Sequence, residues 1–143
     1  MTKRILIIDD NADDIEAIKR FIANEAADVR GVTDSMQSEV AFQEFEPDLV
    51  LLDLHMPAPD GVEILRRLAP VRSRLGFLPV IVLTGDHGAR ARDVALVLGA
   101  NDFLTKPLDP TEVLLRVRNM LRARQLFVDL TNAKEALERR AGA

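Results

Sequence analysis

The stretch that decides the fold is RILIIDD, residues 4–10. Its four consecutive branched apolar residues, 5–8, are typical of a strand that is buried on both faces. Two adjacent carboxylates, Asp9 and Asp10, follow where such a strand leaves the core. Because an uncompensated charge is costly to bury, this acid pair needs a partner from elsewhere in the chain.

The composition bounds the class of protein. The chain has 143 residues, 48% hydrophobic and 29% charged, which fits one globular domain with a sizeable core. Its formal net charge of -4 does not indicate the basic surface that binding of nucleic acid requires. It has no cysteine, so disulfides and thiolate metal sites are excluded and a cytoplasmic location is expected. No apolar run approaches the ~18 residues that span a bilayer, so we expect no membrane segment and no signal peptide.

Short apolar runs alternate with stretches of helical spacing along the chain. The apolar runs predict strands at 5–8, 29–32, 49–52, 80–83 and 103–104. Residues at helical spacing predict three buried helix faces: Ile15, Ile18 and Ile22; Val62, Leu65 and Ala69; Val94 and Leu98. This alternation predicts βαβ units and a five-stranded parallel sheet covered on both faces. We expect a doubly wound α/β fold with the flavodoxin-like strand order 2-1-3-4-5.

Polar residues stand at the carboxyl ends of four predicted strands. The first ends in Asp9 and Asp10, the third in Asp53, the fourth in Thr84, and Lys106 follows the fifth. Ligands of open α/β sheets bind beyond these ends, so the five groups should meet at one edge. Two like charges ~4 Å apart repel by ~4 kcal/mol at an effective dielectric of about 20, and one lysine cannot balance three acids. An all-oxygen set of this kind predicts a Mg²⁺ site.

The chemistry that suits such an edge is phosphoryl transfer. A carboxylate can act as the nucleophile toward phosphorus and become an aspartyl phosphate. Asp53 is the best candidate, because its strand is central and the other two acids are adjacent in sequence, as a metal pair would be. Thr84 and Lys106 would neutralise charge on the phosphoryl oxygens. Asp9 and Asp10 would then hold the cation; capping of the next helix is the alternative for both.

Four motifs resemble one known family. The segments ILIIDD, LVLLDLHMPAPDG, VIVLTGD and DFLTKP, in this order and each at a strand end, are similar to the receiver domain of bacterial two-component response regulators. The resemblance runs from about Lys3 to about Arg122. It implies a signalling switch, not a conventional enzyme, which accepts its phosphoryl group from a sensor histidine kinase or a phosphotransfer protein.

The resemblance also implies roles for the residues around the metal. Asp53 would be the phosphoacceptor, Asp10 a direct Mg²⁺ ligand, and Asp9 an acid that acts on the metal largely through water. The backbone carbonyl of His55 would complete the protein ligands. His55 and Asp86 also occupy positions that influence how fast receivers lose the phosphoryl group.

Further roles follow from the resemblance on the side of the phosphoryl group. Thr84 and Lys106 would contact the phosphoryl oxygens, and Phe103 would take the place of the switch aromatic. An aromatic in a short strand is otherwise a core residue. The peptide bond between Lys106 and Pro107 would be cis, as is usual in the family.

Two other classes of protein use similar groups. Phosphatases of the haloacid-dehalogenase type also use a strand-end aspartate and Mg²⁺, but with a second acid where this chain has His55. A flavodoxin-like binding module, or a receiver that signals without phosphate, would not need the acid pair and Lys106. A zinc site at His55 and His87 is not expected, because they lie in different predicted loops, and we expect both to be solvated.

The last third of the chain predicts one long helix. Asp109 suits the N-cap and Pro110 the first helical position, and no further proline or glycine occurs before Gly142. Such a helix of ~30 residues is ~45 Å long, which exceeds what the sheet can cover. We therefore divide the chain into a receiver domain, 1–122, and a helical extension, 123–143, as a possible coiled-coil linker.

The extension carries a heptad-like pattern. One heptad position holds Met120, Phe127, Lys134 and Ala141, and the other holds Ala123, Leu130 and Leu137. Because no sheet is left to cover Phe127, Leu130 and Leu137, we expect the helix to pair with a second copy; an exposed helix that frays is the alternative. The arginines at 116, 118, 122 and 124 are expected to form a solvated face rather than a nucleic-acid patch.

Overall fold

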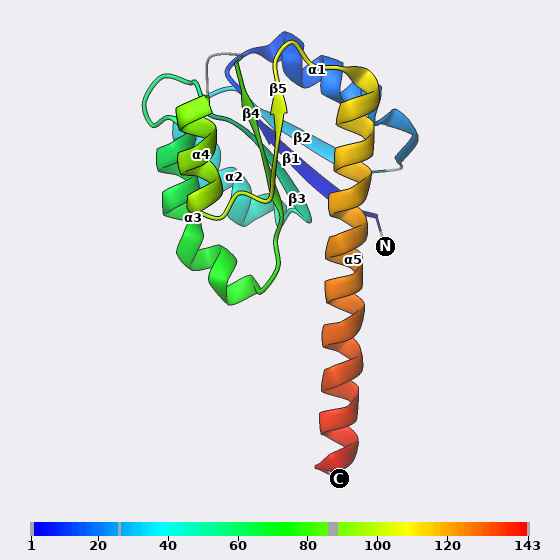
Figure 1. Cartoon of the computed structure of the whole chain (residues 1–143). Coiled ribbons are helices and arrows are strands. Elements are labelled where there is room, and N and C mark those ends of the chain that lie inside the picture. The colour runs from blue at the N-terminus through cyan, green and yellow to red at the C-terminus, as the bar shows by residue number, and fades with distance from the viewer. Residues whose placement is uncertain (1, 26, 86–88, 143) are drawn as a thin grey trace.

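The computed structural model describes residues 2–25, 27–85 and 89–142. Within them, five strands and five α-helices alternate along the chain (Figure 1). The strands are β1 (Arg4–Ile8), β2 (Asp28–Val32), β3 (Leu49–Asp53), β4 (Val80–Thr84) and β5 (Asp102–Thr105). The helices are α1 (Ala12–Phe21), α2 (Ser38–Phe45), α3 (Gly61–Leu75), α4 (Ala89–Val97) and α5 (Pro110–Ala141). Two 3-10 turns, η1 (Ala23–Glu25) and η2 (Ser35–Gln37), flank β2.

The strands form one parallel sheet in the order β2-β1-β3-β4-β5. The predicted doubly wound α/β fold and its strand order 2-1-3-4-5 are therefore confirmed. All five predicted strands are present, and each differs by at most one residue at either end from its apolar run.

Successive residues of the strands face opposite layers of helices. In β1, Ile5 and Ile7 pack against residues of α1 and α5, whereas Leu6 and Ile8 pack against α2 and α3. All four side chains are 0% exposed. Figure 1 shows α1 and α5 on one side of the sheet and α2, α3 and α4 on the other. Because both faces are covered, the strand is apolar at every position, which is the pattern that predicted the fold.

The predicted helix faces are confirmed in part. Ile15 and Ile18 of α1 and Ile22 directly after it are buried, and α3 buries Leu65. Ala69, however, is exposed. In α4, Val94 is 40% exposed, whereas Ala95 is fully buried and Ala91 packs against the core. The prediction is therefore confirmed for Leu98, which packs against the core just after α4, and wrong for Val94, because the core-facing residues within α4 are alanines, which do not stand out as a hydrophobic stripe.

The long C-terminal helix is confirmed. Helix α5 has 32 residues and begins as predicted, with Pro110 in its first turn and the Asp109 side chain accepting the Glu112 backbone N–H at 2.8 Å. Its first half buries Val113 and Val117 against the sheet and α1. Its second half projects beyond the rest of the molecule (Figure 1).

Contact between α5 and the rest of the chain continues past the predicted boundary at residue 122. The ring of Phe127 lies 6.2 Å, centroid to centroid, from the ring of Phe77 in the α3–β4 connection. A Cβ on Gly76 would overlap the Phe127 ring, and Arg124 Nη1 donates to the Phe77 carbonyl at 2.7 Å. No sheet covers Phe127, as expected, but this connection does, and the helix is docked to that point.

The contact between Phe127 and the α3–β4 connection should contribute to the stability of the fold. Phe127→Ala should lower the free energy of unfolding by about 1–2 kcal/mol, because the ring is half-buried against Phe77 and Gly76. Leu130→Ala is the matched control on the same helix: Leu130 is 70% exposed, and its removal should cost less than about 0.5 kcal/mol. Urea denaturation followed by circular dichroism at low micromolar concentration compares the two. Equal losses would contradict a docked Phe127.

Candidate functional site

The carboxyl ends of the central strands bring the predicted polar residues to one place. Asp9 directly follows β1, Asp53 ends β3, Thr84 ends β4, and Lys106 directly follows β5. Asp53 and Lys106, together with Asp10, line a hollow of about 570 Å³ at this edge, whereas Asp9 and Thr84 are buried beside it. Five polar side chains that are separated by up to 97 positions in sequence thus meet at the edge that the parallel topology predicted.

The three acids form a compact cluster, which we call the acidic site. Ligand oxygens of Asp9, Asp10 and Asp53 all lie within 4.8 Å of one another. Asp9 is 0% and Asp53 3% exposed, whereas Asp10 faces solvent. The alternative of helix capping is wrong for both members of the pair: Asn11 is the N-cap of α1, and Asp9 instead accepts the Asn11 backbone N–H at 2.9 Å.

Lys106 is the cation that the protein itself supplies to the acidic site. Its Nζ lies 2.9 Å from Asp9 Oδ2 and 3.5 Å from Asp53 Oδ2. A third carboxylate, Asp14 of α1, is the nearest partner, at 2.8 Å from Nζ. Sequence reasoning missed Asp14, because an acid in the first turn of a helix is already explained by the helix dipole. The bond between Lys106 and Pro107 is cis, as the resemblance implied.

The electrostatics of the acidic site leave negative charge that Lys106 does not neutralise. Burial raises the pKa of Asp53 to about 7; the backbone N–H of His55 opposes this, Asp9 adds to it, and the charge of Lys106 opposes it. Burial would lower the pKa of Lys106, but its bonds to Asp14 and Asp9, and the charges of Asp9 and Asp53, raise it well above its ordinary value. Lys106 is therefore a fixed cation, and Asp53 is the group that resists ionisation.

Thr84 lies next to His55 at the end of β4, and His55 and Gly85 line the hollow there. Thr84 is 2% exposed, and its Oγ1 donates to the Gly85 carbonyl at 3.2 Å. The Nε2 of His55 lies 3.5 Å from the same hydroxyl. The His55 side chain is exposed, as predicted, and its backbone N–H donates to Asp53 Oδ1 at 3.0 Å. Asp86 and His87 lie outside the described residues.

The turn after β3 fixes the nucleophile candidate in place. Asp60 caps α3, accepting the Glu63 backbone N–H at 2.9 Å. Gly61, the first residue of α3, packs directly on the end of β3: a Cβ there would overlap the Asp53 carbonyl and lie 2.6 Å from Leu54 Cα. This glycine is required by close approach of two backbones, so α3 and the Asp53 backbone form one rigid unit.

Phe103 lies at the surface between α4 and α5 rather than deep in the core. Its ring is partly buried, with the Arg92 guanidinium 4.9 Å and the Arg116 guanidinium 6.0 Å from the centroid. Arg116 also pairs with Asp102 at 2.9 Å. The alternative role of Phe103 as a core residue thus describes only part of its environment. The role of Phe103 as a switch stays a prediction.

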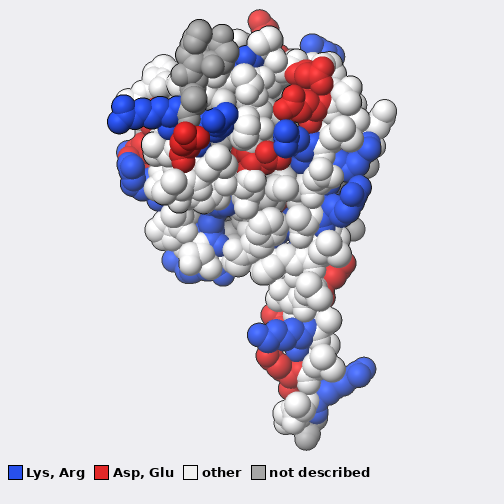
Figure 2. Space-filling model, in the orientation of Figure 1, with Lys and Arg blue, Asp and Glu red and all other residues white. Residues whose placement is uncertain are grey.

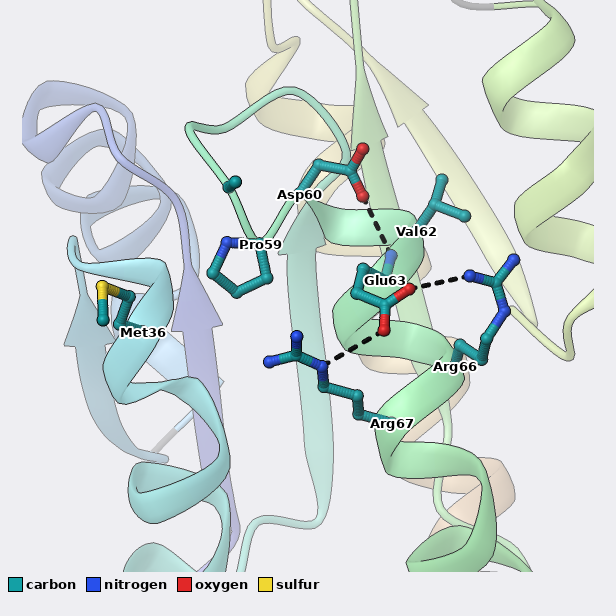
Figure 3. Close-up of a pocket in the computed structure, with 8 residues that line it drawn as sticks. Met36, Pro59, Asp60, Val62, Glu63, Arg66 and Arg67 are labelled. Atoms are coloured by element: carbon teal, nitrogen blue, oxygen red, sulfur yellow. Dashed lines mark hydrogen bonds and ion pairs between the residues drawn. The ribbon is translucent and has the colours of Figure 1, made fainter.

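A second hollow of about 630 Å³ lies on the α2–α3 side of the molecule (Figure 3). Its charged side chains already have partners within the chain: Glu63 binds Arg66 at 2.8 Å and Arg67 at 3.2 Å, and Asp60 accepts the Glu63 backbone N–H. Met36 and Pro59 form its opposite wall. It contains none of the predicted site residues, and it offers no unpaired group comparable with those of the acidic site.

Comparison with known proteins decides the family. The sequence profile described as "Response regulator receiver domain" matches residues 5–118. The chain belongs to the response regulator receiver family. Receiver domains of this family generally use Mg²⁺ and an aspartyl phosphate. Response regulators are signalling proteins rather than conventional enzymes, and they act with histidine kinases.

Relatives of this receiver include longer response regulators. It is 36% identical over 122 residues to the DNA-binding response regulator MtrA of Mycobacterium tuberculosis, covering 85% of this chain and 52% of the relative. It is 30% identical over 134 residues to the alkaline phosphatase synthesis transcriptional regulatory protein PhoP of Bacillus subtilis, covering 94% of this chain and 55% of the relative. The chain thus spans about half the length of these curated relatives.

Solved structures support the same fold. A CheY-like response regulator receiver domain protein from Methanospirillum hungatei superposes with a TM-score of 0.78 at 23% identity, covering 87% of this chain and 98% of that one. This likeness concerns the fold alone. In the part of the chain that the structure describes, no helix is both long and apolar enough to cross a membrane.

Proposed function

We propose that this receiver accepts a phosphoryl group on Asp53 from a sensor histidine kinase or a phosphotransfer protein. The observation that carries the proposal is the acidic site: three carboxylates within 4.8 Å of one another, with Lys106 beside them at the carboxyl edge of the sheet. The proposed step forms a bond between an Asp53 carboxylate oxygen and phosphorus as the bond from phosphorus to the donor breaks. The donor nitrogen or oxygen leaves with the bonding electrons and takes up a proton.

The residues around Asp53 suit this step. Lys106, a permanent cation 3.5 Å from Asp53 Oδ2, would hold one phosphoryl oxygen, and the Thr84 hydroxyl would donate to another. The His55 backbone N–H holds Asp53 Oδ1 at 3.0 Å, which leaves Oδ2 on the side of the lysine. Thr84 would have to exchange its bond to the Gly85 carbonyl for one to the phosphoryl group.

The acidic site also fits the Mg²⁺ that the family uses. An all-oxygen donor set with one exposed and two buried carboxylates matches a hard cation that keeps part of its water shell. Asp10 and Asp53 would be direct ligands, Asp9 would act largely through water, and the His55 carbonyl would complete the set. When bound, Mg²⁺ would neutralise charge on the acids and on the phosphoryl oxygens.

The proposal extends to the location and the partners of this receiver. We propose a cytoplasmic switch without enzymatic turnover beyond its own phosphorylation and dephosphorylation. The described part of the chain would not contact nucleic acid itself: Arg116, Arg118 and Arg124 already pair with acids of the same chain. Acidic and basic side chains are interspersed on the face that Figure 2 shows. We also propose self-association through the C-terminal helix.

Labelling of Asp53 tests the proposal. With Mg²⁺ and acetyl phosphate as donor, the intact mass of the full chain should rise by one phosphoryl group, and Asp53→Asn should stay unlabelled with an unchanged circular dichroism spectrum. Asp14→Asn is the matched control, since Asp14 touches Lys106 but is not a member of the acidic site. Equal labelling of the wild type and Asp53→Asn would refute the assignment.

A further inference from the structure

A row of small and apolar residues follows the outer side of α5. Leu126 is 59%, Leu130 70% and Leu137 64% exposed. With Ala123 and Ala133 these leucines are spaced alternately three and four residues apart. We call these five residues the outer seam.

The outer seam lies on the side of α5 that does not face the sheet. At 3.6 residues per turn, its members lie opposite Val117, Leu121 and Arg124, which are turned toward the chain's own core and the α3–β4 connection. The seam is therefore free while the helix stays docked. Two of the seven residues of the predicted heptad, Met120 and Phe127, are not available for pairing, because they pack against the chain's own body. Residues 123, 130 and 137 therefore occupy one heptad position of the outer seam, and residues 126 and 133 occupy the other.

We propose that the outer seam binds the same seam of a second copy of this chain, in parallel and in register; this deepens the self-association proposed above. Spacing of three and four is that of the a and d positions of a coiled coil. A stripe of this kind is complementary to itself, as a two-fold symmetric interface requires.

Charges beside the seam favour the parallel arrangement. With residues 130 and 133 at positions a and d, Asp129 occupies position g and Lys134 position e. In a parallel in-register pair, position g of one helix faces position e of the next heptad in the partner, so Asp129 would meet the partner's Lys134 twice across the interface. Among the residues that the structure describes, these side chains make exposed contacts within their own helix, Asp129 with Gln125 at 2.8 Å and Lys134 with Glu138 at 4.0 Å.

The expected association is weak. Three leucines and two alanines from each copy make an interface in the class below about 1,200 Å² of total buried area, which assembles transiently. A dissociation constant in the micromolar range is therefore expected. Leu130→Lys should weaken it at least tenfold, because it places a charge at the centre of the seam, whereas Asn132→Lys on the exposed flank should leave it unchanged.

The absence of cysteine allows a direct test on the full chain. Single variants Leu126→Cys and Ala133→Cys should each form a disulfide-linked dimer under mild oxidation, at least tenfold more than Asn132→Cys. Both crosslinks require a parallel register, because an antiparallel pair brings at most one of two d positions opposite itself. Sedimentation of the wild type at high micromolar concentration, with and without Mg²⁺ and beryllium fluoride, measures the association itself.

Each outcome decides the proposal. Crosslinks at both positions, with concentration-dependent sedimentation, support the parallel pair. A crosslink at one position alone overturns its orientation, and monomers under both conditions overturn the interface. Labelling of Asp53 by acetyl phosphate in the same variants is independent of these readouts, so a failure of the proposed phosphorylation is distinguishable from a failure of the outer seam.

Discussion

Replacing Gly61 with alanine is expected to lower the free energy of unfolding by about 3 kcal/mol. The added Cβ would overlap the carbonyl of Asp53 and lie 2.6 Å from Leu54 Cα, so the new contact is with backbone that cannot turn away. Either α3 or the end of β3 has to move. Because β3 delivers Asp53, we also expect slower labelling of the acceptor in whatever fraction stays folded.

Gly31→Ala is the matched control for this prediction. Its Cβ would lie 2.6 Å from Ile15 Cγ2, so the contact is with a side chain rather than with backbone, and Gly31 belongs to the edge strand β2. A smaller loss of about 1–2 kcal/mol is expected, because one buried side chain has to shift. Urea denaturation followed by circular dichroism measures both variants. If Gly61→Ala is no less stable than Gly31→Ala, the close approach of α3 to β3 is not a rigid constraint.

The affinity for Mg²⁺ is expected to fall about tenfold between pH 8 and pH 6. Burial raises the pKa of Asp53 to about 7, and a proton on this carboxyl competes with the metal. Asp53→Asn should bind Mg²⁺ more weakly and with little dependence on pH over this range. Asp10→Asn should also bind more weakly but keep the pH dependence. Calorimetric titration is the suitable measurement, because the chain has neither tryptophan nor tyrosine as a fluorescent reporter.

The stability of the metal-free protein should follow the opposite trend. The pKa of Asp53 is raised in the folded state, so its contribution is fully favourable below about pH 4, the ordinary range of an aspartate, and is lost as the pH rises through about 7. Metal-free protein should therefore gain stability from this group on acidification from pH 7. The stabilisation that Mg²⁺ binding adds should become smaller over the same range, because Mg²⁺ binds more weakly. Wild-type Mg²⁺ affinity that is constant from pH 8 to pH 6 would contradict a raised Asp53 pKa.

The arrangement of the acidic site could be predicted from sequence because two simple regularities coincide. Continuous apolar strands such as Ile5 to Ile8 require cover on both faces, which selects a parallel α/β sheet. Parallel strands then deliver the residue that follows each strand to the same edge. Asp9, Asp53 and Lys106 could therefore be placed together although 97 positions separate the first from the last.

Contacts that depend on which way a helix is turned could not be predicted in the same way. Asp14 contacts Lys106 only because α1 orients its first turn toward that lysine. Phe127 occupies a plausible heptad position, yet Gly76 leaves room for its ring, and a single glycine after a helix carries no signal of that contact. In α4, alanines form the buried side, so hydrophobicity placed Val94 wrongly on the buried face.

The docking of Phe127 on the α3–β4 connection also offers α5 a pivot point near the middle of its length. About 26 Å of helix separates Phe127 from Pro110, which lies four residues after Lys106, and about 21 Å separates it from Ala141. If α5 pivots as a rigid rod, a displacement of about 1 Å at the Pro110 end becomes about 0.8 Å in the opposite direction at Ala141. The two arms are nearly balanced, so a movement at the sheet edge would arrive at the far end reversed in direction and almost undiminished.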